Sequence, residues 1–419
     1  MVSGMDLQRI NIRLQEIRGN LNDTFGGLHV VLVGDLVQLP PVMQLPIYKE
    51  PQLESGNKKK KKDIETAQRH IIASTAGYDI YRNHFLSVTT LVENMRALHD
   101  RPFTENLQTI RNGNAPDASD SFKRLQSRYF FNMSPDDARK AAAEFQDAPI
   151  LVPTNNARHA FNRSRIAARA TSDLTQQSAN TLRLDAVLEK KNLEERMEKY
   201  IRRLGDEDTE RLPMRLYLQQ GMPVMITHNQ DCICGIANGQ LGTISKIQFQ
   251  PETKWTTMAD ESMGGILVKV PDRIPEVIFV KVNRADTVPN SPQLQAMREQ
   301  YGLEPGTVPI FPYQNDTCKI DLAKNRTIRA KVTQFPLVPA HAISIHKAQG
   351  QTLPKVIIGS FKLANSFASF SAIYVALSRA KTLDGLLLFE PFNDALIERL
   401  RRPQELVEEL ERLATLETR

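Results

Sequence analysis

The stretch most informative for chemistry is Gly34-Asp35-Leu-Val-Gln38-Leu-Pro-Pro41, which places one acid and one amide directly after an apolar run. That run, Val30 to Val33, has no polar alternation, which is typical of a strand covered on both faces in a parallel α/β sheet. Open α/β sheets bind ligands at the carboxyl ends of such strands. The spacing therefore predicts that Asp35 and Gln38 face a ligand site. Asp35 alone has two readings, a catalytic acid or an acid that caps a helix or fixes the loop.

Five further strings carry polar groups in a fixed order along the chain. They are Glu93-Asn-Met-Arg96, Val152-Pro-Thr-Asn155, Gly221-Met-Pro-Val-Met225 with Gly235-Ile-Ala-Asn-Gly239, Ile345-His-Lys-Ala-Gln-Gly-Gln-Thr352, and Tyr374-Val-Ala-Leu-Ser-Arg379. Each is short enough to arise by chance, but six in this order across nearly the whole chain are not. Together they resemble the motifs of superfamily 1 DNA helicases, in particular the Pif family and the helicase domains of Helitron transposons.

The resemblance implies ATP as nucleotide and Mg²⁺ as its metal. Phosphoryl transfer needs positive charge on the γ-phosphate as its bond breaks, and arginines supplied across a domain cleft provide it. By resemblance, Arg96 and Arg379 are two such arginines, one from each α/β domain, and Gln38 orients the attacking water or senses the γ-phosphate. Outside such motifs, an arginine is usually a surface ion-pair residue. The resemblance also implies that the nucleotide-binding positions are Gly34, Asp35, Gln349 and Gly350.

Four residues are candidates for DNA contacts: Thr154, Asn155, His346 and Lys347. They offer neutral donors and one cation at the ends of predicted strands and helices, which suits phosphate binding. The resemblance implies 5′ to 3′ movement on single-stranded DNA, with forked DNA as a related partner. It also implies roles in repair, recombination, and telomere or transposon metabolism. Aromatic residues make up only 6% of the chain, so the sequence does not identify stacking residues.

Two motifs that the family needs do not occur in the sequence. One is Gly-x-x-x-x-Gly-Lys-[Ser/Thr], which cradles the phosphates and positions magnesium; the other is the Asp-Glu pair that holds Mg²⁺. No metal ligand is therefore predicted, and we expect the chain alone not to hydrolyse ATP at a helicase rate. In the family a Ser-Met-Val stretch commonly follows that pair, and this chain starts Met1-Val-Ser. The expectation is a helicase truncated just after the pair, and the alternative is a non-enzymatic single-stranded DNA-binding module.

Composition restricts the partners only loosely. The net charge of +6 and pI near 9.1 suit a polyanion but fit an ordinary basic protein equally well. No apolar run approaches the roughly 18 residues of a membrane span, so a membrane is not an expected partner. The three cysteines, Cys232, Cys234 and Cys318, form neither a disulfide framework nor a four-ligand zinc set. An intracellular location follows, and the resemblance implies the nucleus, with the mitochondrion as alternative.

Hydrophobic periodicity predicts an α/β protein with a small inserted antiparallel β-barrel. The resemblance implies that its parallel sheets are tandem RecA-like sheets, the first incomplete. We expect helices at 1–20, 103–111, 156–170, 183–205, 342–349, 371–380 and 393–419, with two more in 120–146. Strands are expected at 30–33, 85–91, 148–152, 224–227, 242–247, 265–270, 277–282, 356–359 and 386–389. Residues 49–72, with five lysines at 58–62, should be a solvated loop, and 286–318 a long loop.

These elements predict five segments. Residues 1–146 are the back part of the first RecA-like domain, and 147–220 begin the second. Residues 221–335 form the inserted barrel and its loop, 336–391 complete the second RecA-like domain, and 392–419 are a helical tail.

Overall fold

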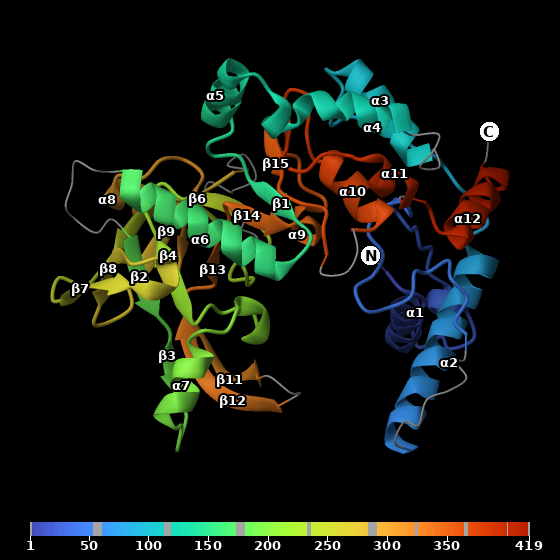
Figure 1. Ribbon diagram of the computed structural model, residues 1–419. Coiled ribbons are helices and arrows are strands. Elements are labelled where there is room, and N and C mark those ends of the chain that lie inside the picture. Colours follow the sequence, from blue (N-terminus) through green and yellow to red (C-terminus); the bar gives the residue numbers. More distant parts are fainter. Residues whose placement is uncertain are drawn as a thin grey trace. The chain divides into compact units, whose positions relative to one another are not determined.

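The computed structural model describes residues 2–52, 61–112, 119–172, 181–232, 236–283, 291–322, 326–363, 368–399 and 401–417. The chain divides into two compact units, one made of residues 1–138 with 348–419 and the other of residues 139–347 (Figure 1). None of the helices in the described ranges has the length and apolar character needed to cross a bilayer.

The first unit begins with helix α1 (Gly4–Arg18), which confirms the helix predicted at 1–20. Ser3 and Asp6 form a capping box at its start, and Gly19 ends it in the left-handed conformation. Helix α2 (Lys61–His84) packs against α1 (Figure 1). The two helices can approach closely because Gly77 has no side chain. A Cβ at this position would lie only 1.7 Å from the Gly4 carbonyl oxygen. A small apolar core joins the two helices to the segment between them, and its buried residues are Leu7, Phe25, Ile47 and Tyr81.

Three expectations for this unit were wrong. Residues 30–33 are not a buried strand: the side chains of Val31 and Val33 are 82% and 87% exposed. Residues 85–91 contain only an isolated bridge at Val88. A buried strand needs neighbours, and the described strands of this unit, β15 (Val356–Ile358) and β16 (Leu386–Leu388), pair in parallel with each other. Residues 61–72 belong to α2 rather than to a loop, while Lys58 to Lys60 lie outside the described residues.

The remaining helices of the first unit follow the sequence patterns. The helix predicted at 103–111 is confirmed, and the tail predicted at 393–419 is helical but divided into two helices. The remaining helices are α3 (Arg101–Asn112), α4 (Ser119–Leu125), α10 (Phe370–Leu377), α11 (Asp394–Arg399) and α12 (Gln404–Thr415). Helix α12 is tied to α2 through the buried carboxylate of Glu409, which accepts hydrogen bonds from Tyr81 at 2.5 Å and Arg82 at 2.7 Å.

The second unit contains a parallel pair, antiparallel sheets, and a mixed sheet in which β2 and β8 are parallel. Strands β1 (Ile150–Val152) and β14 (Ala342–Ser344) are parallel, and helix α6 (Asn155–Ser172) packs on them (Figure 1). A five-stranded antiparallel sheet has the order β10 (Thr307–Ile310), β9 (Val277–Val282), β6 (Leu241–Gln248), β5 (Pro223–Ile226), β13 (Leu337–Pro339). A second sheet has the order β4 (Arg215–Leu218), β2 (Thr181–Asp185), β8 (Ile266–Pro271), β7 (Trp255–Asp260). The predicted strands at 224–227, 242–247, 265–270 and 277–282 are thus confirmed.

Three helix or loop predictions in this unit need correction. The helix predicted at 183–205 is two strands, β2 and β3 (Val187–Glu189), before a short helix α7 (Glu195–Ile201), because the leucines of β2 pair with those of β4. The long loop predicted at 286–318 contains helix α8 (Pro292–Tyr301), strand β10 and the start of β11 (Tyr313–Leu322), which pairs with β12 (Arg326–Gln334). The helix predicted at 342–349 is strand β14 and one helical turn, α9 (Ile345–Ala348).

Candidate nucleotide and nucleic-acid sites

Arg379 is the most deeply buried charged residue among the predicted site residues, with 1% of its surface exposed. It follows helix α10, whose start is capped by the Ser369 hydroxyl. Its Nε donates to the Val375 carbonyl at 2.8 Å and its Nη2 to the Ser378 hydroxyl at 2.8 Å. Its Nη1 donates to the Gln351 carbonyl at 3.2 Å. The guanidinium is therefore locked against the end of its own helix.

Arg96 also contacts the end of helix α10. It lies on a turn fixed by the Asn94 side chain, which accepts from the Arg96 backbone N–H at 3.1 Å. Arg96 Nε donates to the Thr352 hydroxyl at 3.0 Å, and Nη1 donates to the Ser378 carbonyl at 3.2 Å. Both arginines thus lie in one unit, whereas the sequence predicted one from each α/β domain.

The two guanidinium groups lack a counter-charge in direct contact. Within the described part of the chain their hydrogen-bond acceptors are all neutral. Burial, and after it the charge of Arg96, lower the pKa of Arg379 to about 10. Burial also lowers the pKa of Arg96. Because a buried charge is costly unless an opposite charge compensates it, an anion is the ligand that this pair favours.

Asp35 is occupied by structural contacts. Its Oδ1 accepts from the Val37 backbone N–H at 3.1 Å, its carbonyl accepts from the Gln38 N–H at 3.1 Å, and Arg111 forms an ion pair with it at 2.9 Å. These contacts agree with the loop-fixing reading of the sequence. The catalytic reading has no contact that supports it.

The other predicted nucleotide-binding residues lie on two facing loops of the first unit. Gln349 Nε2 donates to Gln38 Oε1 at 3.4 Å, which brings the two amides together. Gly350 has φ +81°, a conformation that favours glycine. A Cβ on Gly34 would meet no atom within 4 Å, so its backbone is accessible to a ligand.

In the second unit, the four predicted DNA-contacting residues follow two paired strands. Strands β1 and β14 are parallel, with Val152 opposite Ser344, so the residues after them lie at one edge of the pair. Thr154 caps helix α6 by accepting from the Ala157 N–H at 3.2 Å, and Asn155 is exposed beside it. His346 is exposed, and Lys347 donates to Asn238 at 3.3 Å.

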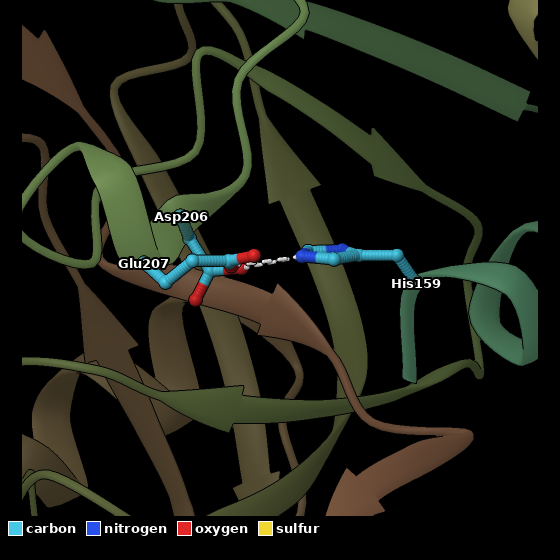
Figure 2. Close-up of side chains that lie close together, drawn as sticks. All are labelled: His159, Asp206 and Glu207. Atoms are coloured by element: carbon cyan, nitrogen blue, oxygen red, sulfur yellow. Dashed lines mark hydrogen bonds and ion pairs between the residues drawn. The ribbon is translucent and has the colours of Figure 1, made fainter. Parts of the chain in front are cut away.

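A cluster that the sequence did not reveal lies beside the first turn of α6. Figure 2 shows His159 pointing at the carboxylates of Asp206 and Glu207, and the three groups are close enough to bind a metal ion. However, Arg158 Nη2 already lies 2.7 Å from Asp206 Oδ1, 3.1 Å from Glu207 Oε2 and 3.2 Å from His159 Nε2. The guanidinium occupies the position that a metal ion would take, so the cluster is an internal ion-pair network. The sequence did not reveal this cluster because His159 and Asp206 lie 47 positions apart in the chain.

Known proteins that resemble this chain are helicases. Residues 339–386 match the UvrD-like helicase C-terminal domain. The chain is 25% identical over 409 residues to the ATP-dependent DNA helicase PIF1 of Emericella nidulans, covering 93% of this chain and 46% of the relative. The corresponding protein of Candida albicans is 23% identical, with 98% and 44% covered. These matches support a resemblance to the Pif-type helicases of superfamily 1.

Solved structures agree at the level of the fold. The Pif1 helicase from Candida albicans covers the whole chain with a TM-score of 0.58 and 22% identity, and 75% of that structure is matched. The Bacteroides Pif1 helicase in complex with ADP-AlF3 and single-stranded DNA gives a TM-score of 0.57 and 22% identity, with 99% and 73% covered. The chain spans less than half the length of the two curated relatives described above.

Proposed function

We propose that this chain provides the γ-phosphate-sensing and DNA-contacting part of a Pif-type ATP-dependent DNA helicase that moves 5′ to 3′ on single-stranded DNA. One observation carries the nucleotide half of the proposal. Arg96 and Arg379 are fixed by neutral partners, share Ser378 as a hydrogen-bond partner, and have no carboxylate in contact within the described residues. Such preorganised donors favour a phosphate over water because they need no rearrangement when charge develops.

The residues present fit a terminal phosphate but not its magnesium ion. Asp35, whose charge acts on Arg379, forms an ion pair with Arg111. The sequence holds neither a P-loop nor the Asp-Glu pair. ATP would supply the reactive phosphoanhydride when bound. Arg96 and Arg379 would stabilise charge on its terminal phosphate, and Gln38, held by Gln349, would orient a water molecule.

The DNA half of the proposal rests on the shared edge of β1 and β14. Thr154 and Asn155 follow one strand, and His346 and Lys347 follow the other, so a nucleic-acid backbone could contact both pairs. In this proposal the parallel strands belong to RecA-like sheets. The strands within residues 221–335 correspond to the inserted β-barrel, while β2, β3 and β4 lie before that segment in the chain.

A second function is a single-stranded DNA-binding module without hydrolysis. The absence of the P-loop motif from the sequence favours it. The two functions share the DNA surface and differ in whether the chain binds a terminal phosphate, so polyphosphate binding at Arg96 and Arg379 separates them.

The test is ATPase activity of the chain with and without oligo-dT, together with oligo-dT binding by anisotropy at several salt concentrations. We expect no DNA-stimulated turnover, and DNA affinity that falls steeply with salt. Robust turnover would overturn our account of the active site. Absence of DNA binding at low salt would overturn both functions.

A further inference from the structure

Three aromatic side chains of the second unit gather where two cations also lie, although they come from separate parts of the chain. The rings of His228 and Tyr313 stack with centroids 4.6 Å apart and an angle of 30° between their planes. His228 follows strand β5, and Tyr313 begins strand β11. Stacked, partly exposed aromatic rings are the platform on which single-stranded nucleic acids lay their bases.

Phe311 adds a third ring, with 48% of its surface exposed. Gln230 clamps its backbone from both sides: Gln230 Nε2 donates to the Phe311 carbonyl at 2.8 Å, and Gln230 Oε1 accepts from the Phe311 N–H at 3.3 Å. The backbone is held while about half of the apolar side chain stays exposed to water. A ligand that covers this exposed apolar surface would gain the free energy of its burial.

The first of the two cations, Arg211, is exposed and follows Glu210, and both have positive φ values of 66° and 50°. Such strained conformations in non-glycine residues concentrate at functional sites. The turn is held by the Arg211 N–H, which donates to the Asp206 carbonyl at 2.7 Å. The side chain of Glu210 is turned to Asn315, which donates to it at 2.7 Å.

The turn that carries Arg211 lies beside the rings, because His228 forms a hydrogen bond with the backbone of Glu210. The charge of Arg211 also lowers the pKa of His228, in addition to the larger effect of burial. Burial, and after it the charge of Arg211, lower the pKa of Lys347. Lys347 bonds to Asn238 of the loop that follows His228. The rings and the two cations therefore lie in one region of the second unit.

We propose that His228, Phe311 and Tyr313 form a base-stacking platform for single-stranded DNA, flanked by the phosphate-binding cations Arg211 and Lys347. This inference rests on the proposed DNA-binding function and assigns the stacking residues that the sequence did not identify. Aromatic faces bind any base, so the platform adds affinity without sequence preference. The cations add an affinity that depends on salt.

The test compares oligo-dT with an abasic oligonucleotide of the same length, using anisotropy of the purified chain. Phe311→Ser and His228→Ala should each weaken oligo-dT binding about tenfold while changing abasic binding little. His228→Phe, which keeps a ring, should restore the preference. Arg211→Ala should weaken both ligands alike and lower the salt slope by about one phosphate contact.

Two matched controls lie on strand β7 and just before it, in the same unit. Trp255→Ser removes a ring that is 45% exposed, and Lys254→Ala removes one exposed cation. Both should bind as the parent does, and thermal melts should show all variants folded. If the parent binds neither ligand, the proposed function fails. If the parent binds DNA but the Phe311 and His228 variants keep their preference for oligo-dT over the abasic strand, the base-stacking platform is refuted while the proposed function stands.

Discussion

Arg96 and Arg379 hold the same residue from two sides: Arg96 Nη1 donates to the Ser378 carbonyl at 3.2 Å, and Arg379 Nη2 donates to the Ser378 hydroxyl at 2.8 Å. Two cations held this close repel each other, and an anion bound between them would offset that repulsion. We therefore expect an anion to stabilise the pair. This relationship makes the nucleotide site testable without any turnover.

Binding of a polyphosphate should raise the melting temperature of the chain, and Arg379→Met should abolish the increase. The reason is mass action: a ligand present at 100 times its Kd stabilises the folded state by about 2.7 kcal/mol. Thermal melts with and without pyrophosphate measure it. Arg13→Met is the control, because Arg13 is an exposed cation of the same unit that pairs only with Glu16 at 2.9 Å. An equal increase in the Arg379 variant would contradict the anion site.

Asp35 and Arg111 should couple in a double-mutant cycle. Their partly buried ion pair at 2.9 Å fixes the loop that carries Gln38. Asp35→Ala and Arg111→Ala should each reduce the free energy of unfolding, and the double variant should lose about 1 kcal/mol less than their sum. Denaturant titrations give the values. Additive losses would mean that Asp35 has a role independent of Arg111.

His341 should make stability fall in weak acid. Its side chain is buried, its Nε2 has no hydrogen-bond partner, and burial together with Arg165 and Arg169 lowers its pKa to about 4. Between the unfolded pKa of about 6.5 and about 4, the unfolded state binds a proton that the folded state does not. Stability is thus unaffected by this group above pH 6.5, declines as the pH falls, and levels off below pH 4.

The expected contribution of His341 is at most about 3 kcal/mol. Denaturant titrations from pH 7 to pH 4 should show a shallower decline for His341→Asn than for the parent chain. His99→Asn, which changes an exposed histidine, should follow the parent. Parallel curves for the parent and His341→Asn would refute the assignment.

Glu409→Gln should destabilise the first unit strongly. The carboxylate is buried and accepts from Tyr81 at 2.5 Å, Arg82 at 2.7 Å and Arg412 at 2.7 Å. Breaking such a buried ion network costs about 3 kcal/mol or more. The neighbouring variant Glu408→Gln, on an exposed position of the same helix, should leave the melting temperature unchanged. Similar melts for both variants would show that Glu409 does not tie α12 to α2.

Zinc should leave the parent chain unaffected and stabilise Arg158→Ala. The Arg158 guanidinium occupies the centre of the His159, Asp206 and Glu207 side chains, and its removal leaves three ligand atoms without a cation. Melts with Zn²⁺ and with EDTA measure the effect. An increase for the parent chain would mean that the metal displaces the arginine.

The sequence by itself determined the features that depend on neighbouring residues. The helical periods of α1, α3 and α12 and their end signals, such as Gly19, are local, so they could be predicted. The motif order pointed to the Pif-type helicases because residue types at short spacing carry that resemblance. The same motifs also identified the candidate site residues, such as Gln38, Arg96 and Arg379.

The tertiary structure decided whatever depends on distant partners. Residues 30–33 have the composition of a buried strand, but a strand forms only beside another, so the pattern was misleading. Residues 183–189 are strands because β2 and β3 pair with β4 and β12. The neutralisation of Asp35 by Arg111 and the stacking of His228 on Tyr313 join residues 76 and 85 positions apart. Such contacts leave no periodic signal in the sequence, because folding alone brings those side chains together.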